Sequence, residues 1–325
     1  MREFGLESAP IRAESAPAVS EGSAAAHPGM STPAAAPAHA PPAFRVISAR
    51  PPTALIHANP FAAARHLYQQ RHLVWRFAVR DVQTRYKGSF LGVLWSFIMP
   101  LLLLAVYTFV FGVVFRARWE PTGDEGTLHF AIALFAGLIV FHIFSECVTK
   151  ATTVITSHPG YVKRVVFPLE ALPLSLVVAS LINAAISFLI LVCGLLVVRQ
   201  AVPLTIIYLP LVLLPLVFLT LGCSWFLASL GVFIRDATPM VSVAVMILMF
   251  LSAVFYPAAA LPENLRWMVE ANPIALVVDA TRATLVFGGR PSGRTFLALT
   301  GFSLLVMQGG YLWFMRTKRW FADVI

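Results

Sequence analysis

The sequence predicts an all-α integral membrane protein with six transmembrane helices, an N-terminal amphipathic interface helix, and two short re-entrant helices between spans five and six. Three observations support this fold class. Of the 325 residues, 58% are hydrophobic and only 12% are charged, whereas soluble domains carry about 25% charged residues. Apolar stretches recur along the chain, and each approaches the roughly 20 residues that a helix needs to cross a bilayer. The stretches are continuous, unlike the alternating segments of roughly 10 residues in membrane β-barrels.

The charge balance agrees with a membrane protein. A net charge of +9 and an isoelectric point near 9.9 would suggest nucleic-acid binding in a soluble chain. Here the basic residues lie beside apolar stretches, where they orient spans and contact anionic lipid. Membrane lipid is therefore a predicted partner and nucleic acid is not. The cysteines, Cys147, Cys193 and Cys223, fall inside apolar stretches and form no disulfide framework.

Residues 1–59 are rich in Ala, Pro and Ser and lack any apolar periodicity, which predicts a disordered tail. No continuous apolar stretch follows Arg2, so the tail does not resemble a secretory signal.

Residues 60–88 predict an amphipathic helix that lies in the membrane interface. Pro60 suits the first turn of a helix, and the segment is too charged to span a bilayer. Aromatic and β-branched side chains share one stripe at helical spacing: Tyr68, Trp75, Val79, Val82 and Tyr86. Leu73 and Phe77 lie off this stripe, so an ordinary surface helix is the alternative.

Residues 89–325 contain six predicted spans. They are residues 89–115, 130–149, 171–198, 204–234, 239–257 and 295–315. Pro210 and Pro215 predict a kink or tilt in the fourth span. Lys and Arg are more frequent in the loops that share a side with both termini, which places both termini in the cytoplasm.

Residues 258–294 are too polar to span and too apolar to form a free loop. The segment predicts two short helices, one opened by Pro262 and the other by Asn272-Pro273. Because backbone in hydrocarbon must hydrogen-bond internally, two helices that dip into the membrane and return are the preferred interpretation. Asp279 and Arg282 are three residues apart and can pair on one helix face. A helical hairpin outside the bilayer is the alternative.

Several chemical motifs are absent from the sequence. None of the four lysines, Lys87, Lys150, Lys163 and Lys318, stands in a phosphate-binding P-loop, and no cysteine pair or HExxH spacing indicates a metal site. His142 and Glu146 form the single candidate pair inside a span, but Glu146 is also placed to pair with Lys150. The chain alone is therefore predicted not to be an enzyme, and to have no catalytic or metal-binding residue.

The loop at residues 157–173, SHPGYVKRVVFPLEALP, is compact and basic. Pro159-Gly160 breaks the preceding helix, and Tyr161, Lys163 and Arg164 then offer one aromatic ring and two charges. We interpret the loop as a docking element for a cytoplasmic partner. The alternative is a simple connection whose basic residues only follow the charge asymmetry.

These segments carry a resemblance. The motifs are RYKGSFLGVLWSFIMPLLLLAVYTFVFG (85–112), YVKRVVFPLEALPL (161–174), Arg235-Asp236, the Phe255–Pro257 tripeptide and NPIALVVDATRATLVFG (272–288). Together, in order and spacing over residues 65–320, they resemble type-2 ABC-transporter permeases of the polysaccharide-export branch, which serves O-antigen, teichoic acid and capsule.

The resemblance implies a transmembrane subunit of the bacterial cytoplasmic membrane that exports lipid-linked polysaccharide. Two copies would form the pore, and two separate ATPase subunits would supply ATP and Mg, so this chain itself binds no cofactor. The residues implied to dock the ATPase are Arg76, Arg80, Arg85, Ser157, His158, Tyr161, Lys163, Arg164 and Glu170. Those implied to form the extracytoplasmic gate are Phe255, Tyr256, Trp267, Asn272, Asp279 and Arg282.

A glycan route has its own physical requirements. Burying a sugar hydroxyl without a partner costs roughly 1–3 kcal/mol, so a long glycan needs a lined, wet channel. Aromatic rings stack on sugar faces without setting a register. The candidate channel residues are Tyr107, Phe111, Trp225 and Phe250, although ordinary packing could equally explain them. The competing functions are an exporter of a drug or small lipid, a membrane glycosyltransferase, and a scaffold protein.

Overall fold

A computed structural model describes residues 60–87, 91–114, 127–162 and 167–325, and most of these residues are helical, with no β-strand among them. The predicted tail at 1–59 and the docking candidates Lys163 and Arg164 lie outside the described residues. The α-helices are α2 (Pro60–Gln69), α3 (Arg71–Tyr86), α4 (Trp95–Tyr107), α5 (Thr127–Val154), α6 (Pro159–Val162), α7 (Ala171–Arg199), α8 (Leu209–Phe233), α9 (Ala237–Leu251), α10 (Arg266–Glu270), α11 (Pro273–Leu285), α12 (Gly293–Thr317) and α13 (Phe321–Val324).

The long helices follow the apolar stretches of the sequence. Five segments are long and apolar enough to cross a membrane: Trp95–Val114, Leu128–Val154, Ala171–Val198, Leu204–Phe233 and Gly293–Val324. The predicted fifth span corresponds to α9, which has 15 residues and extends about 22 Å, less than the roughly 30 Å of a bilayer core. The all-α membrane fold is confirmed, and the count of six spans stays a prediction.

The helix ends reflect particular residues. Pro60 begins α2 as predicted, and Pro210 lies in the first turn of α8, where no N–H is required. Pro215 lies inside α8. Asn272 caps α11 by accepting hydrogen bonds from the backbone N–H groups of Ile274 and Ala275, as the Asn272-Pro273 dipeptide predicted.

The predicted single helix over residues 60–88 is divided into α2 and α3. At Gln70 the backbone tightens, because its N–H bonds to the carbonyl of Leu67 only three residues earlier. The face that packs on the bundle carries Val74 and Ala78, both buried. Tyr68 and Trp75, which belong to the predicted stripe, are exposed instead. The stripe therefore does not supply the packing of α3.

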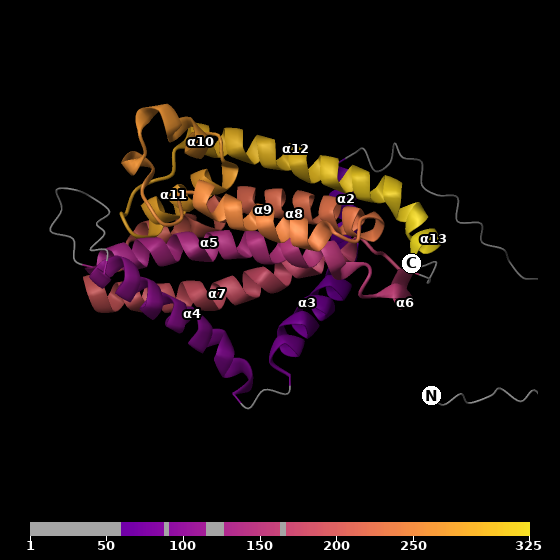
Figure 1. Cartoon of the computed structure of the whole chain (residues 1–325), viewed down its shortest axis with the longest axis horizontal. Coiled ribbons are helices and arrows are strands. Elements are labelled where there is room, and N and C mark those ends of the chain that lie inside the picture. The colour runs from indigo at the N-terminus through magenta and orange to yellow at the C-terminus, as the bar shows by residue number, and fades with distance from the viewer. Residues whose placement is uncertain (1–59, 88–90, 115–126, 163–166) are drawn as a thin grey trace, which may run out of the picture. The chain divides into compact units, whose positions relative to one another are not determined.

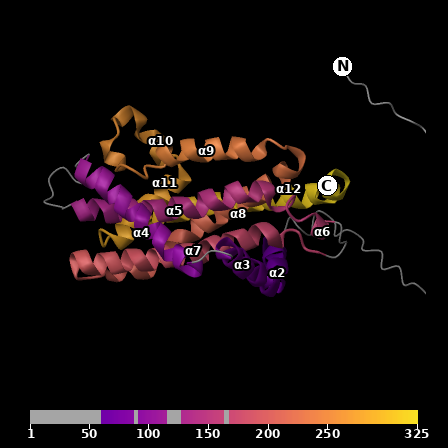
Figure 2. The same ribbon diagram turned by 60° about the horizontal axis from the view of Figure 1, so that its bottom comes forward.

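Helix α5 lies at the centre of the bundle and contacts α7, α8, α9 and α11 (Figure 1). Its residues dominate the main hydrophobic cluster. Helices α10 and α11 lie at one end, which we call the Arg282 end, and α3, α6 and α13 lie at the other, which we call the Glu170 end (Figure 1). The turned view shows α9 and α7 on different sides of α5 (Figure 2).

Small residues allow α8 and α12 to cross closely. A Cβ atom added at Gly310 of α12 would collide with the backbone carbonyl of Gly222 on α8, and one added at Gly222 would collide with the backbone of Val306. Close helix contact through small residues is the usual means of association where lipid removes the hydrophobic driving force.

We expect Gly310→Ala to destabilise the protein by about 1–3 kcal/mol, because the helices must separate to admit the methyl group. The thermal unfolding midpoint of the detergent-purified protein measures this effect. Gly309→Ala is the matched control, since a Cβ atom there meets nothing within 4 Å. Equal midpoints for the two variants would contradict the close crossing.

Candidate functional site

At the Glu170 end, α3 and the loop after α5 form an aromatic and basic cluster. Arg80 donates to His158 Nε2 at 3.3 Å and to the hydroxyl of Tyr161 at 3.5 Å, and it lies over the ring of Phe77 at 4.7 Å. Tyr161 stacks on His158 and on Phe167, with ring centroids 5.6 and 4.5 Å apart. The structure thus brings together three predicted docking residues, Arg80, His158 and Tyr161. Arg76 and Ser157 are also exposed at their positions.

A second group of charges connects α3 to α5. Lys150 Nζ lies 3.0 Å from Asp81 Oδ2 and 3.0 Å from Glu146 Oε1, so the Glu146–Lys150 pair predicted from sequence is confirmed. Arg85 bonds to the same Glu146, and His142 Nε2 lies 3.7 Å from its other oxygen. Arg85, predicted to dock an ATPase, is therefore engaged within the chain.

The predicted docking role of Glu170 is wrong, because this residue is only 2% exposed. Its carboxylate accepts hydrogen bonds from His66 at 2.8 Å and from Lys318 at 2.6 Å, and Gln70 Nε2 lies 3.5 Å away. Its backbone carbonyl accepts from the indole N–H of Trp225 at 3.1 Å. Glu170, at the start of α7, therefore connects α2, α8 and the segment that follows α12. Sequence reasoning missed His66 and Lys318, since no local spacing relates them to Glu170.

Ionisation of this group follows from its contacts. Burial alone would raise the pKa of Glu170, but the hydrogen bond from His66 and the positive charge of Lys318 outweigh burial and lower it to about 2. The hydrogen bond to Glu170 raises the pKa of His66, and partial burial opposes that rise. The contact thus favours a charged histidine beside a charged carboxylate.

One face of α5 is polar over the half nearer the Glu170 end. His142, Ser145, Thr149 and Thr153 recur at helical spacing, and the His142 side chain is 69% exposed. The hydroxyls of Thr152 and Thr238 lie 2.9 Å apart and place the start of α9 beside this helix. Polar side chains are costly against lipid and usually face a water-filled path or a partner. This face can hydrogen-bond to a polar solute.

Aromatic rings cluster near the Arg282 end. Phe111 stacks on Phe255 at 5.6 Å, Tyr107 lies 6.0 Å from Phe255, and Phe250 lies 5.5 Å from it, measured between ring centroids. Three channel candidates thus meet the gate candidate Phe255. Trp225 does not join them. It is 1% exposed, packs on Tyr311 and bonds to Glu170, so its predicted place in the channel is wrong for this structure.

Arg282, a gate candidate on α11, fastens that helix to its neighbours. Arg282 is 1% exposed and donates to the carbonyls of Ala133, Ala253 and Val254 at 2.9, 2.8 and 2.5 Å. A Cβ atom at Gly137 would lie 2.5 Å from Arg282 Nη2, so that glycine makes room for the guanidinium. The helix α11 is thereby fastened to α5 and to the end of α9.

The remaining gate candidates make contacts of their own. Arg282 Nη1 lies 3.4 Å from Asp279 Oδ1, which confirms the predicted pair. Asn272 Nδ2 donates to Ser252 Oγ at 3.0 Å and to the Leu251 carbonyl at 3.3 Å. The Tyr256 hydroxyl donates to the Phe250 carbonyl, whereas Trp267 on α10 is exposed.

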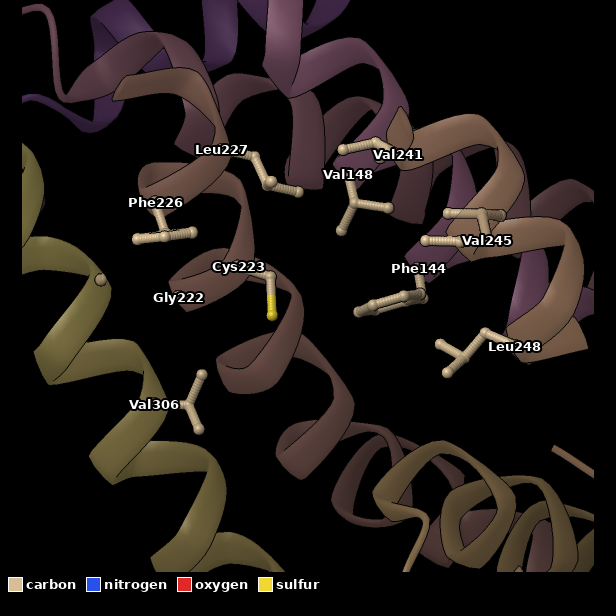
Figure 3. A pocket seen from close by; sticks show the side chains of 12 residues that line it. Phe144, Val148, Gly222, Cys223, Phe226, Leu227, Val241, Val245, Leu248 and Val306 are labelled. Carbon is tan, nitrogen blue, oxygen red and sulfur yellow. The ribbon is translucent and has the colours of Figure 1, made fainter. Parts of the chain in front are cut away.

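An apolar groove of about 420 Å³ lies between α5, α8, α9 and α12, and we call it the Phe144 groove. Figure 3 shows side chains of Phe144, Cys223, Val245 and Leu248 around it. No charged side chain lines it, so it offers a glycan nothing to bond. In the described part of the chain, no cluster of three or more His, Cys, Asp or Glu residues could hold a metal.

Comparisons with known proteins agree with this architecture. Residues 72–286 match the ABC-2 type transporter family. The chain is 30% identical over 264 residues to the O-antigen export system permease protein RfbA of Myxococcus xanthus, covering 80% of this chain and 98% of the relative. It is 26% identical to the protein of that name from Klebsiella pneumoniae, covering 76% and 92%. It is also 23% identical to the polysialic acid transport protein KpsM of Escherichia coli, covering 73% and 90%. This chain belongs to the ABC-2 type transporter family.

Proposed function

We propose that the protein is the transmembrane subunit of an ABC exporter that moves lipid-linked polysaccharide across the bacterial cytoplasmic membrane. The observation that carries the proposal is the similarity to O-antigen export permeases, which extends over 98% of one relative. Two further features support the proposal. Several helices are long and apolar enough to cross a membrane. The sequence contains no P-loop, which agrees with a subunit that does not itself bind ATP.

We propose a separate ATPase subunit as the source of energy. The cluster of Arg80, His158 and Tyr161 supports a docking surface, since it combines a cation and stacked rings on a helix and a neighbouring loop. In this proposal the Glu170 end faces the cytoplasm, as do both termini. Two copies of the chain enclose the route, and the many exposed apolar side chains of α4 and α9 would face lipid or the second copy.

The polar face of α5 supports a polar cargo. Each unpartnered sugar hydroxyl would cost roughly 1–3 kcal/mol in hydrocarbon, and hydroxyls and imidazole on the helix supply partners. The aromatic cluster around Phe255 would then close the outer end, because stacked rings exclude water and ions. A drug or small lipid is the second candidate cargo, favoured by the apolar lining of the Phe144 groove.

Deleting the gene in its host tests the cargo. We expect surface glycan to disappear and lipid-linked glycan to accumulate on the cytoplasmic side, with both effects reversed by the intact gene. Surface glycan is measured by immunoblot of whole cells and the intracellular pool by mass spectrometry of extracted lipid. Unchanged surface glycan together with loss of efflux of an amphipathic dye would instead identify the second cargo class.

Matched variants separate docking from insertion. Arg80→Glu should reduce co-purification of the ATPase subunit and reduce export, because it reverses the charge that holds His158 and Tyr161. Arg65→Glu is the control, since Arg65 is an exposed arginine of α2. Equal export by both variants would contradict the docking surface.

A further inference from the structure

A second groove opens beneath the N-terminal helices at the Glu170 end. It measures about 500 Å³ and is bounded by α2, α3, α7, α8 and α12. Its wall is mostly apolar and includes Val74, Val178, Phe218, Leu221 and Met307. We call it the Arg71 groove, after the one charged residue in its lining.

The mouth of the Arg71 groove has the composition of a membrane interface. Tyr68 and Trp75 line it and are exposed, and rings with one polar edge concentrate where hydrocarbon meets water. If α2 and α3 lie in the interface, as the sequence predicts, the apolar wall below them faces acyl chains. A dry gap of this size beside lipid would leave the wall without packing partners.

Arg71 lies at this mouth and contacts Tyr68. Its guanidinium lies over the Tyr68 ring at 4.6 Å, and Nη1 donates to the Tyr68 carbonyl at 3.3 Å. No acidic side chain lies among the lining residues, so the positive charge of Arg71 is not neutralised there. The nearby carboxylate of Glu170 is already paired with His66 and Lys318.

The surrounding helices reinforce the positive charge. Together α2 and α3 contain a single acidic residue, Asp81, which pairs with Lys150. Their basic residues are Arg65, Arg71, Arg76, Arg80 and Arg85. Basic interfacial helices attract anionic lipid, at about 1 kcal/mol for each Lys or Arg near the surface.

We propose that the Arg71 groove binds one anionic phospholipid, with an acyl chain along the apolar wall and the phosphate on the guanidinium of Arg71. The bound lipid fills the space between α3 and the bundle and so helps to hold α2 and α3 in place. The Phe144 groove is of similar size and has no cation in its lining, so we expect no such selectivity for head group there.

Lipid titration of the delipidated full-length protein tests the proposal. Native mass spectrometry counts the lipid that remains bound at increasing collision energy, with phosphatidylglycerol and phosphatidylcholine as probes. We expect each chain to retain one phosphatidylglycerol molecule and to retain it in preference to phosphatidylcholine. The retention of phosphatidylglycerol should become about fivefold weaker after Arg71→Gln. Arg76→Gln is the matched control, because Arg76 is an exposed arginine of the same helix outside the groove.

A second variant keeps the test independent of charge. Val178→Trp should fill the apolar wall and remove the retained lipid while Arg71 is unchanged. Three outcomes would each overturn the proposal. The first is equal retention of the two lipids, and the second is an equal effect of Arg71→Gln and Arg76→Gln. The third is full lipid retention by a folded Val178→Trp protein. Displacement of the lipid by inorganic phosphate alone, or preference for a polyprenyl phosphate over phosphatidylglycerol, would also overturn it. None of these readouts depends on glycan export.

Discussion

Replacing Arg282 with methionine should destabilise the protein by roughly 3–5 kcal/mol, because three buried carbonyls lose their donor at once. Methionine is similar in length but donates no hydrogen bond. The carbonyls of Ala133, Ala253 and Val254 are then left without the guanidinium that joins α5, the end of α9 and α11. The thermal midpoint of the purified protein measures the loss.

The same change should release α11 locally before the bundle unfolds. Single cysteines placed along residues 262–287, in a protein lacking Cys147, Cys193 and Cys223, report this release. In the parent an impermeant thiol reagent added from outside should label the ends of the segment strongly and the middle weakly. With Arg282→Met the middle should become strongly labelled.

Two further variants define the anchor. Asp279→Asn should have a small effect, since Asp279 is partly exposed and lies 3.4 Å from the guanidinium. Arg282→Lys should fall between Arg282→Met and the parent, because an ammonium cannot span three carbonyls in fork geometry. A methionine variant with parental midpoint and parental labelling would show that the anchor is dispensable. Uniform strong labelling in the parent would contradict the re-entrant arrangement.

Glu170→Ala should cost about 3–5 kcal/mol, the range found when one partner of a buried ion pair is removed. His66 and Lys318 lose their shared acceptor, and α2 loses its polar attachment to α7. We expect hydrogen exchange to rise over residues 60–86 more than over the centre of α5. Glu170→Gln keeps the shape and should recover part of the loss, and Glu263→Gln, at an exposed turn, is the control.

The pH dependence of this attachment has a definite sign. The pKa of His66 is raised in the folded protein, so its contribution is complete below the ordinary value of 6.5 and is lost as pH rises through the raised value. The pKa of Glu170 is lowered to about 2, so its contribution is present above the ordinary value of 4.5 and is lost on acidification. The attachment of α2 should therefore be most stable at pH values above 4.5 and below the raised pKa of His66. The protection of the α2 amides, corrected for the intrinsic pH dependence of exchange, should fall between pH 5 and 8. A constant protection over this range would contradict the role of His66.

Local features of the structure were predictable from the sequence. The long helices follow from continuous apolar stretches, because backbone groups in hydrocarbon must bond within their own segment. Asn272-Pro273 begins α11, since a cap and the first turn depend on adjacent residues. The pairs Glu146–Lys150 and Asp279–Arg282 also followed, because helical spacing brings side chains three or four residues apart together.

Only the tertiary structure decided the roles of residues whose partners lie far along the chain. Glu170 looked like a surface charge beside a docking loop, yet His66 and Lys318 enclose it from opposite ends of the sequence. Trp225 looked like one more aromatic residue of a span, yet its N–H reaches that same glutamate. Arg282 had a visible local partner, but its main acceptors are carbonyls of other helices. Periodicity specifies which face of a helix is apolar, whereas the helix that covers that face depends on long-range packing, which no local pattern encodes.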